Sequence, residues 1–196
     1  MRPEPYTRPE YVSAFRELAA RIAASLENVP PRVLPIRMYV AGGAALHFHT
    51  GERVSVDVDA VFSRRIALPD GLEVAYRDED GSARLLYFDR QYNDTLGLMH
   101  ADAQDDSIPL TLEGVDSRVL DVRILTPVDL AVSKLGRFSE QDRADIAALA
   151  RRGLVNATNL ERRALESLKI YVGDTRRLRG NIASAVEIVA ANIPLV

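Results

Sequence analysis

Two adjacent glycines, Gly42 and Gly43, are the feature that most restricts how this chain folds. They follow residues 37–41, a short apolar segment that predicts a strand, and they precede residues 44–50, which predict a helix closed by Gly51. Glycine lets another group approach the backbone closely, and the free N–H groups and dipole at the start of a helix favour an anion. We therefore predict a phosphate-binding turn, for which a tight turn without a ligand is the alternative.

Two aspartates follow at a spacing of two residues. Residues 54–62 alternate as a strand does, with Val58 and Ala60 on one face and Asp57 and Asp59 on the other. Carboxylates at i and i+2 leave the same face of a strand, with Cα atoms about 6.6–7 Å apart. Such hard oxygen ligands suit Mg²⁺, which keeps coordination positions for water and substrate phosphates. The sequence thus predicts Asp57 and Asp59 as metal ligands, with simple solvation of a polar face as the alternative.

The hydrophobic pattern of the whole chain predicts an α+β protein, with a βαβ unit first, a hairpin in the middle and helices at the end. Helices are expected at 11–28, 44–50, 128–136, 139–152, 156–172 and 175–192, and strands at 37–41, 54–62, 72–76, 83–88 and 118–125. Residues 89–109 are polar and acidic and predict a loop. We expect an α/β core over residues 1–125 and a helical region over residues 126–196 that packs on it.

The composition excludes several classes of protein. With 47% hydrophobic and 27% charged residues among 196, the chain has the usage of a soluble globular protein. It contains no cysteine, which excludes disulfide frameworks, thiol nucleophiles and cysteine-ligated metal sites. No apolar run approaches the roughly 20 residues of a membrane span, and the first residues lack an apolar targeting segment. We therefore expect a cytoplasmic protein without a membrane partner.

A lysine in the third predicted helix carries information because the chain otherwise prefers arginine. Of 25 basic residues, only Lys134 and Lys169 are lysines. Lys134 lies in an apolar segment, where a compact ammonium would suit a triphosphate, and a snorkelling surface lysine is the alternative. Asp142 and Asp145 follow on the core-facing stripe of the next helix, where carboxylates need a partner. Asp142 also forms the pattern of a capping box with Ser139.

The order of these motifs resembles the nucleotidyltransferase superfamily typified by DNA polymerase β, in which two small residues, a short helix and an Asp-x-Asp strand follow one another. Within it, Gly-Gly-x-Ala-Leu at 42–46 and Arg-x-Ser-x-Asp-x-Asp at 53–59 are similar to the AbiE-type toxin nucleotidyltransferases of bacterial toxin–antitoxin systems. The segment 125–137, which contains Lys134, and the Asp-x-x-Asp at 142–145 are similar to further motifs of that group.

The resemblance implies a nucleotidyltransferase fold, a short mixed or antiparallel sheet flanked by helices, with a helical C-terminal third. It implies Mg²⁺-dependent transfer of a nucleotide from an NTP to an acceptor hydroxyl. The acceptor would be RNA, such as a tRNA end, or a protein side chain, and the protein would be a toxin with a cognate antitoxin. The implied roles are metal binding by Asp57 and Asp59, nucleotide binding by Gly42, Gly43, Arg53, Ser55 and Lys134, and orientation of Lys134 or Arg53 by Asp142 and Asp145.

A third metal carboxylate also has a candidate in the sequence. Asp121 is the best candidate, because its neighbours Leu120 and Val122 would face the core and leave its carboxylate on the other side. An ion pair with Arg123 at the surface is an equal alternative. If no third acid exists, a general base for the acceptor hydroxyl would come from elsewhere, and Asp142 and Asp145 are candidates.

Two further alternatives concern partners. Between residues 143 and 180 there are nine basic residues against four acidic ones, in a chain of net charge −3. This basic segment is either a phosphate-binding surface or a solvated helix face. The alternative to an enzyme is a catalytically inactive nucleotidyltransferase-like module that binds a nucleotide or a partner protein. The chain keeps the acids that such a module would be expected to lose.

Overall fold

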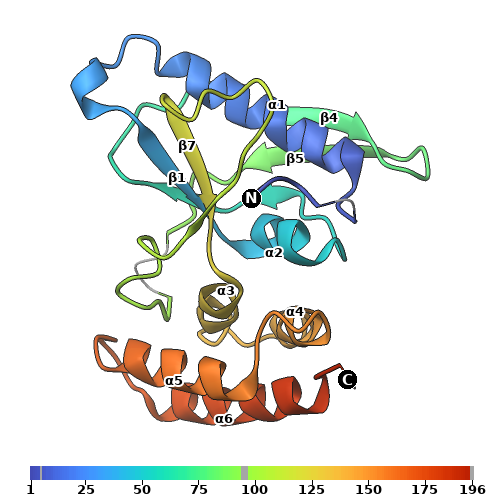
Figure 1. The fold of residues 1–196 in the computed structure, drawn as a ribbon, viewed down its shortest axis with the longest axis vertical. Helices are drawn as coiled ribbons and strands as arrows, with labels where there is room; N and C mark the ends of the chain where they lie inside the picture. Colours follow the sequence, from blue (N-terminus) through green and yellow to red (C-terminus); the bar gives the residue numbers. More distant parts are fainter. Residues whose placement is uncertain (5, 94–96, 195–196) are drawn as a thin grey trace. The chain divides into compact units, whose positions relative to one another are not determined.

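A computed structural model of the chain describes residues 1–4, 6–93 and 97–194 and confirms the α+β class (Figure 1). The chain forms two compact units, Met1–Tyr92 with Ser107–Ile124, and Asn93–Asp106 with Leu125–Val196. The change from the α/β unit to the helical unit falls between Ile124 and Leu125. The polar segment before Ser107, which we assigned to the core, belongs to the helical unit, and its residues 94–96 lie outside the described part.

The first unit contains two sheets. The larger one has the strand order β3-β1-β7-β6, and its strands are β1 (Ile36–Val40), β3 (Ala60–Phe62), β6 (Ile108–Pro109) and β7 (Leu120–Ile124). β1 runs parallel to β7 and antiparallel to β3. The smaller sheet has the order β2-β5-β4, with β2 (Asp57–Val58), β4 (Glu73–Arg77) and β5 (Ala83–Phe88). β4 and β5 form the expected antiparallel hairpin, and β2 pairs with β5 in parallel.

Two helices of the first unit supply much of its core. α1 (Pro9–Ser25) contacts β4, β5 and β7, and its apolar stripe at spacings of three and four is buried. α2 (Gly42–Thr50) is buried at every residue except Gly42, because it is apolar on nearly all sides. The rings of Phe15 on α1 and Phe48 on α2 meet edge to face at 4.9 Å. α2 is therefore an internal element, and its first residues are held tightly in place.

The strand predicted over 54–62 is wrong in its extent. Residues 54–56 are not in a strand, and Val56 is 58% exposed, although alternation over 54–62 would place it on the same face as the buried Val58. The rest is divided at Asp59 between β2 of one sheet and β3 of the other. The reason is hydrogen bonding to two different neighbours: Val58 O accepts from Asp89 N at 3.1 Å, and Asp59 O accepts from Ala41 N at 2.8 Å.

The second unit consists of four helices, α3 (Pro127–Ser133), α4 (Glu140–Arg151), α5 (Ala157–Leu168) and α6 (Arg176–Ala191), together with the preceding polar segment. α3 and α4 each begin within one residue of the predicted start. Thr126 caps α3 by accepting from Asp129 N, with Pro127 at the first position, and Ser139 and Asp142 form a complete capping box on α4. α3 ends earlier than predicted, so that Lys134 is its C-terminal cap.

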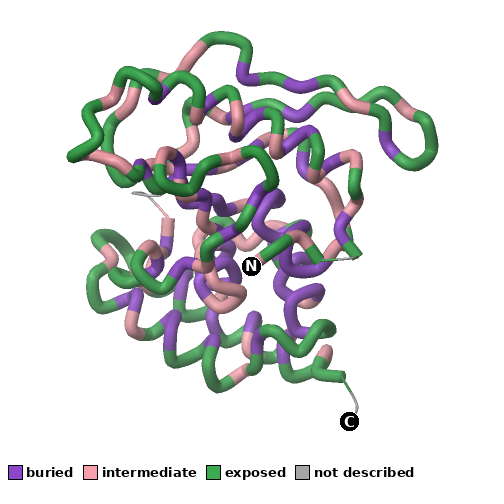
Figure 2. The backbone as a smooth tube through the Cα atoms, turned by 45° about the horizontal axis from the view of Figure 1, so that its top comes forward, coloured by how far each residue is buried: buried purple, intermediate pink, exposed green. Residues whose placement is uncertain are grey.

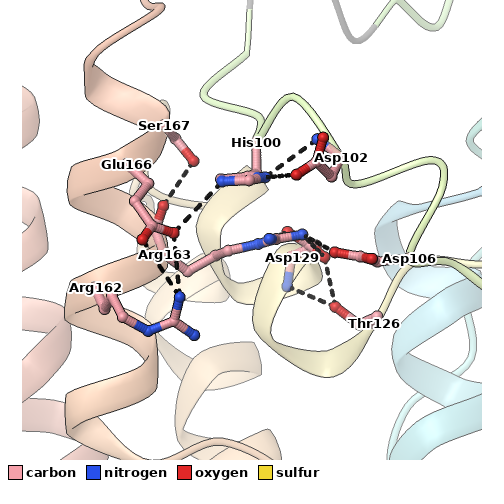
Figure 3. A network of polar contacts seen from close by, with 9 residues as sticks. All are labelled: His100, Asp102, Asp106, Thr126, Asp129, Arg162, Arg163, Glu166 and Ser167. Carbon is pink, nitrogen blue, oxygen red and sulfur yellow. Dashed lines mark hydrogen bonds and ion pairs between the residues drawn. The ribbon is translucent and has the colours of Figure 1, made fainter.

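Buried polar groups hold the helices of the second unit to one another (Figure 3). Arg163 on α5 donates from Nε to the fully buried carboxylate of Asp129 on α3 at 2.7 Å, and from Nη2 to Asp106 at 2.7 Å. Glu166, one turn further along α5, lies 3.5 Å from Nε2 of His100. Because Asp106 and His100 belong to the polar segment, this segment is attached to α5 at two points.

Buried residues recur at intervals along the helices and strands of each unit, with exposed residues between them (Figure 2). This pattern is expected of elements that turn one face to a core. Within the described residues, no helix is long and apolar enough to span a membrane.

Asp129→Ala tests the buried pair. The substitution leaves the guanidinium of Arg163 buried with one carboxylate fewer, so we expect the free energy of unfolding to fall by about 3 kcal/mol or more. Asp174→Ala is the matched control, because Asp174 and its partner Arg176 are both largely exposed and such surface pairs contribute little to stability. Urea denaturation followed by circular dichroism measures both, and equal losses in the two variants would contradict this assignment.

Candidate active site

Gly42 lies directly against Asp59. The hydrogen bond from Ala41 N to Asp59 O sets the two segments side by side, and Gly42 then turns with φ +58°. A Cβ atom at Gly42 would lie 1.9 Å from Oδ2 of Asp59. Only glycine avoids this clash, and only glycine adopts this left-handed φ without strain. The first glycine of the pair is therefore required by the position of the second aspartate.

Gly43 has a similar relation to Ser55 and Arg53. A Cβ atom at Gly43 would lie 2.7 Å from Cβ of Ser55 and 3.0 Å from Nη1 of Arg53. The guanidinium of Arg53 thus lies at the first turn of α2, where the helix N–H groups and dipole also favour negative charge. The structure brings together six of the predicted residues: Gly42, Gly43, Arg53, Ser55, Asp57 and Asp59. We call this set the glycine–aspartate site.

The two carboxylates of the glycine–aspartate site are half-buried. The hydroxyl of Ser55 donates to Oδ1 of Asp57, and Ser55 itself is buried. Ser55 therefore positions one of the predicted metal ligands, a role that its sequence position alone does not indicate. Two carboxylates beside a backbone turn that excludes side chains form a donor set that suits Mg²⁺ and phosphate oxygens.

The structure does not bring Asp121 to this site. In the parallel pairing of β1 with β7, Asp121 is aligned with Arg37, four residues before Ala41, which is about 13 Å along the strand. Its carboxylate lies 3.3 Å from Nη1 of Arg123 and 3.8 Å from Nε of Arg37. Among the described residues, no three His, Asp or Glu side chains come together as a metal site would require. We therefore leave Asp121 out of the metal site, because its register on β7 separates it from the aspartate pair.

Tyr11 and His47 support the site and were missed by the sequence analysis. The two rings meet edge to face at 4.8 Å, and both side chains are fully buried. Burial, followed by the charges of Tyr76 and Asp57, raises the pKa of the Tyr11 phenol. The sequence signal for these two residues is a polar side chain within an otherwise apolar helix. This pattern does not show which residue the side chain contacts.

His47 connects three segments through its two ring nitrogens. Nε2 accepts a hydrogen bond from Arg8 N at 3.0 Å, so Nδ1 carries the proton and donates to Arg53 O at 3.2 Å. Burial, aided by the charge of Arg8, lowers the pKa of His47 to about 4. The neutral ring thus holds the backbone of Arg53 against α2.

Lys134 and Asp145 form a buried pair in the second unit. Lys134 is 7% exposed and Asp145 is 2% exposed, and Nζ donates to Oδ2 of Asp145 at 2.6 Å. Gln141 donates to the other oxygen of Asp145 at 2.8 Å. The interpretation of Lys134 as a snorkelling surface lysine is therefore wrong. Binding of phosphate by Lys134 stays a prediction, and its ammonium is already oriented by Asp145.

Asp142 has a different partner from Asp145. It accepts two hydrogen bonds of 2.8 Å from Arg137 and one of 2.9 Å from Ser139 N. Burial alone would raise the pKa of Asp142, but the bonds from Arg137 and Ser139 outweigh it and lower the pKa to about 2. Asp142 is thus a helix cap and an arginine partner, and it remains ionised at neutral pH.

The basic segment of residues 143–180 is less available to an anion than its charge suggests. Arg163 is buried between Asp129 and Asp106. Arg162 pairs with Glu166 on the same helix, and Arg176 pairs with Asp174. Much of what the sequence presents as free positive charge in α5 and at the start of α6 is therefore neutralised locally, which favours the interpretation as a structural and solvated face.

Comparison with known proteins places the chain in a class. The model of a family described as "Nucleotidyltransferase of unknown function (DUF6036)" matches residues 17–185, and the chain belongs to this family. The match includes the glycine–aspartate site as well as Lys134, Asp142 and Asp145. A search of curated proteins finds no match. The class is thus a nucleotidyltransferase family, whose description gives neither a substrate nor an acceptor.

Gly42→Ala tests the close approach of α2 to Asp59. The new Cβ would have to displace the carboxylate, in addition to the strain of the left-handed backbone. Gly71→Ala is the matched control, because Gly71 also has a positive φ, of +67°, but nothing lies within 4 Å of its Cβ position. In urea denaturation we expect Gly71→Ala to cost about 1 kcal/mol and Gly42→Ala to cost at least about 1 kcal/mol more. Equal costs would show that the contact does not constrain the fold.

His47 gives the first unit a specific pH dependence. Below its ordinary pKa of 6.5 the unfolded chain protonates this residue, whereas the folded protein does not until the pH reaches about 4. The contribution of neutral His47 to stability is therefore complete above pH 6.5 and is lost as the pH falls to 4, by up to about 3 kcal/mol. The difference in unfolding free energy between the protein and His47→Gln should shrink over this range, because the variant has no imidazole to protonate. A difference that does not vary with pH would contradict this origin.

Proposed function

We propose that the protein is a Mg²⁺-dependent nucleotidyltransferase that transfers a nucleotide from an NTP to an acceptor hydroxyl. One observation carries the proposal: Gly42 and Gly43 have no room for a side chain because Asp59, Ser55 and Arg53 lie directly against them. A turn at a helix start, two carboxylates and a guanidinium at one place form a site with chemistry for a metal-bound triphosphate. Membership in a nucleotidyltransferase family supports the same reaction class.

The carboxylates of Asp57 and Asp59 would hold Mg²⁺, since two hard oxygen donors leave coordination positions for phosphate oxygens. When bound, the metal would neutralise charge on the phosphates and align them for displacement. The hydroxyl of Ser55 donates a hydrogen bond to the carboxylate of Asp57 and so keeps that carboxylate in position. The acceptor oxygen forms a bond to the α-phosphorus, the bond to the bridging oxygen of the leaving pyrophosphate breaks, and the hydroxyl proton is released to the medium.

The backbone and Arg53 would bind the rest of the triphosphate. The N–H groups of the first turn of α2 have no partner within the helix and suit phosphate oxygens. The guanidinium of Arg53, close to Gly43, adds positive charge with a planar set of donors. His47 holds Arg53 through its carbonyl, so it acts as a positioning residue.

Lys134 has a proposed role through the resemblance of its motif to AbiE-type proteins. A compact ammonium on a rigid helix end can neutralise phosphate charge, and Asp145 and Gln141 keep the group in a defined place. The same resemblance suggests RNA, such as a tRNA end, or a protein as the acceptor, and a toxin with a cognate antitoxin as the biological context.

A catalytically inactive module that binds a nucleotide is the second candidate. The observation that favours it is the lack of a third acidic ligand beside Asp57 and Asp59 within the described residues. Such a module would bind an NTP in the presence of Mg²⁺ without forming a product.

Incubation with each radiolabelled NTP, Mg²⁺ and total cellular RNA tests the function. We expect label in a macromolecule with the unchanged protein and a loss of at least about 100-fold with Asp57→Asn or Asp59→Asn. Asp121→Asn is the matched control and should keep transfer within about threefold, because Asp121 lies away from the site. Binding of an NTP without any labelled product would favour the inactive module, and full activity in both site variants would exclude the glycine–aspartate site as the catalytic centre.

A further inference from the structure

One pocket of the first unit is lined in part by the residues that directly follow Asp59 in the chain. It has a volume of about 250 Å³ and is lined by residues from the segments 60–68 and 88–92; we call it the arginine pocket. Ala60 and Val61 directly follow Asp59 in the chain, and Asp89 N donates to Val58 O at 3.1 Å. Both walls of the arginine pocket are therefore attached to the backbone that carries Asp59.

The arginine pocket is positively charged. Arg64, Arg65 and Arg90 line it against one acid, Asp89. Arg64 and Arg65 are exposed, and neither guanidinium has a hydrogen-bond or ion-pair partner among the described residues. Arg90 donates to the carbonyl of Pro69. In a protein whose net charge is −3 and in which many arginines are paired, two adjacent unpaired guanidiniums beside a pocket are suited to a ligand with phosphate groups.

Three aromatic side chains are among the residues that line the arginine pocket. The rings of Phe62 and Phe88 stack at 5.7 Å with an interplanar angle of 28°, and Tyr92 adds a third aromatic side chain to the lining. The volume is below the range of roughly 300–1,000 Å³ that is usual for sites that enclose a whole small molecule. It suits one planar group of a longer chain, such as a single nucleobase, whose phosphates would then extend to Arg64 and Arg65.

We propose that the arginine pocket binds the end of a single-stranded RNA acceptor and presents it to Asp57 and Asp59. This inference builds on the proposed function, since it assigns the acceptor of the same reaction. The chain order supports it: residues 42–55 form the turn for the triphosphate, and residues 60–66 form the arginine pocket, with Asp57 and Asp59 between them. Two substrates that react with each other need adjoining sites of this kind.

An RNA fits this pocket better than a protein acceptor does. The phosphates of an RNA chain are regularly spaced anions that, unlike the triphosphate, are not bound to Mg²⁺. A guanidinium binds such a phosphate through two parallel hydrogen bonds. Stacking on aromatic rings and arginine is the usual mode by which single-stranded nucleic acid binds without sequence preference. The serine or threonine side chain of a protein acceptor has neither a phosphate for the guanidiniums to bind nor a ring to stack on the aromatic side chains.

Fluorescence anisotropy of a labelled ten-nucleotide single-stranded RNA, without NTP or Mg²⁺, tests the proposal. The double variant Arg64→Gln/Arg65→Gln should bind about tenfold or more weakly at low salt, and the slope of its salt dependence should fall by about 0.7 for each phosphate that the variant no longer neutralises. Arg32→Gln is the matched control in the same unit, because Arg32 is likewise exposed and unpaired among the described residues but lies away from the pocket. Arg162→Gln/Arg176→Gln tests the basic helices and should bind as the unchanged protein does.

The outcomes separate this inference from the function on which it builds. RNA affinity that is unchanged in Arg64→Gln/Arg65→Gln, or the absence of measurable RNA binding, would overturn the inference and leave nucleotide transfer, measured by the effects of Asp57→Asn and Asp59→Asn, unaffected. Loss of Mg²⁺–NTP binding in the arginine double variant would also overturn it, by assigning the pocket to the triphosphate. Transfer of the radiolabelled nucleotide to protein instead of RNA would also overturn the inference. RNA binding that depends on Arg64 and Arg65, without any nucleotide transfer, would support RNA binding by the arginine pocket and would contradict the proposed transferase activity.

Discussion

The hydrogen bond between Ala41 N and Asp59 O is the contact on which the rest of the site depends. It lies at the point where the chain leaves β1 and enters α2, and where the second aspartate passes from one sheet to the other. Because the two backbones are this close, the residue after Ala41 has no space for a Cβ atom. The glycine turn, the aspartates and the start of α2 are therefore one rigid arrangement, as a site that positions reacting groups requires.

This arrangement is stabilised from within the core as well as at the surface. α2 is buried along its length, and the ring of His47 connects it to the start of α1 and to the backbone of Arg53. Tyr11 packs against the same ring from α1. A histidine that is neutral because it is buried supplies one donor and one acceptor without a charge, which an apolar residue of similar size could not do. The polar support of the site is thus enclosed by the hydrophobic core of the first unit.

Charged side chains organise the second unit in a different way. Asp129 with Arg163, and Asp145 with Lys134, are ion pairs in which both members are buried or nearly so. Such pairs contribute less to stability than their Coulomb attraction suggests, because both groups lose their hydration, but removal of one member is costly. The pairs therefore constrain which helix faces meet: Arg163 fixes α5 on α3, and Lys134 fixes the end of α3 on α4.

Local sequence predicted most of the secondary structure and the residues of the glycine–aspartate site. The helix cap at Ser139 and the hairpin of β4 and β5 depend on interactions between residues near in sequence, so composition and spacing are enough to find them. The division of residues 54–62 at Asp59 was not predictable in this way, because it depends on pairing with β1 and β5, which come from distant parts of the chain.

Asp121 is the clearest contrast: its alternation on a strand is a property of the sequence, whereas its distance from Asp59 follows from the register of β7 on β1. The sequence by itself determined which residues have the chemistry for nucleotide transfer, and the tertiary structure alone decided which of them meet and which arginines remain unpaired, because hydrogen-bond register and ion pairing join residues that are far apart in the chain.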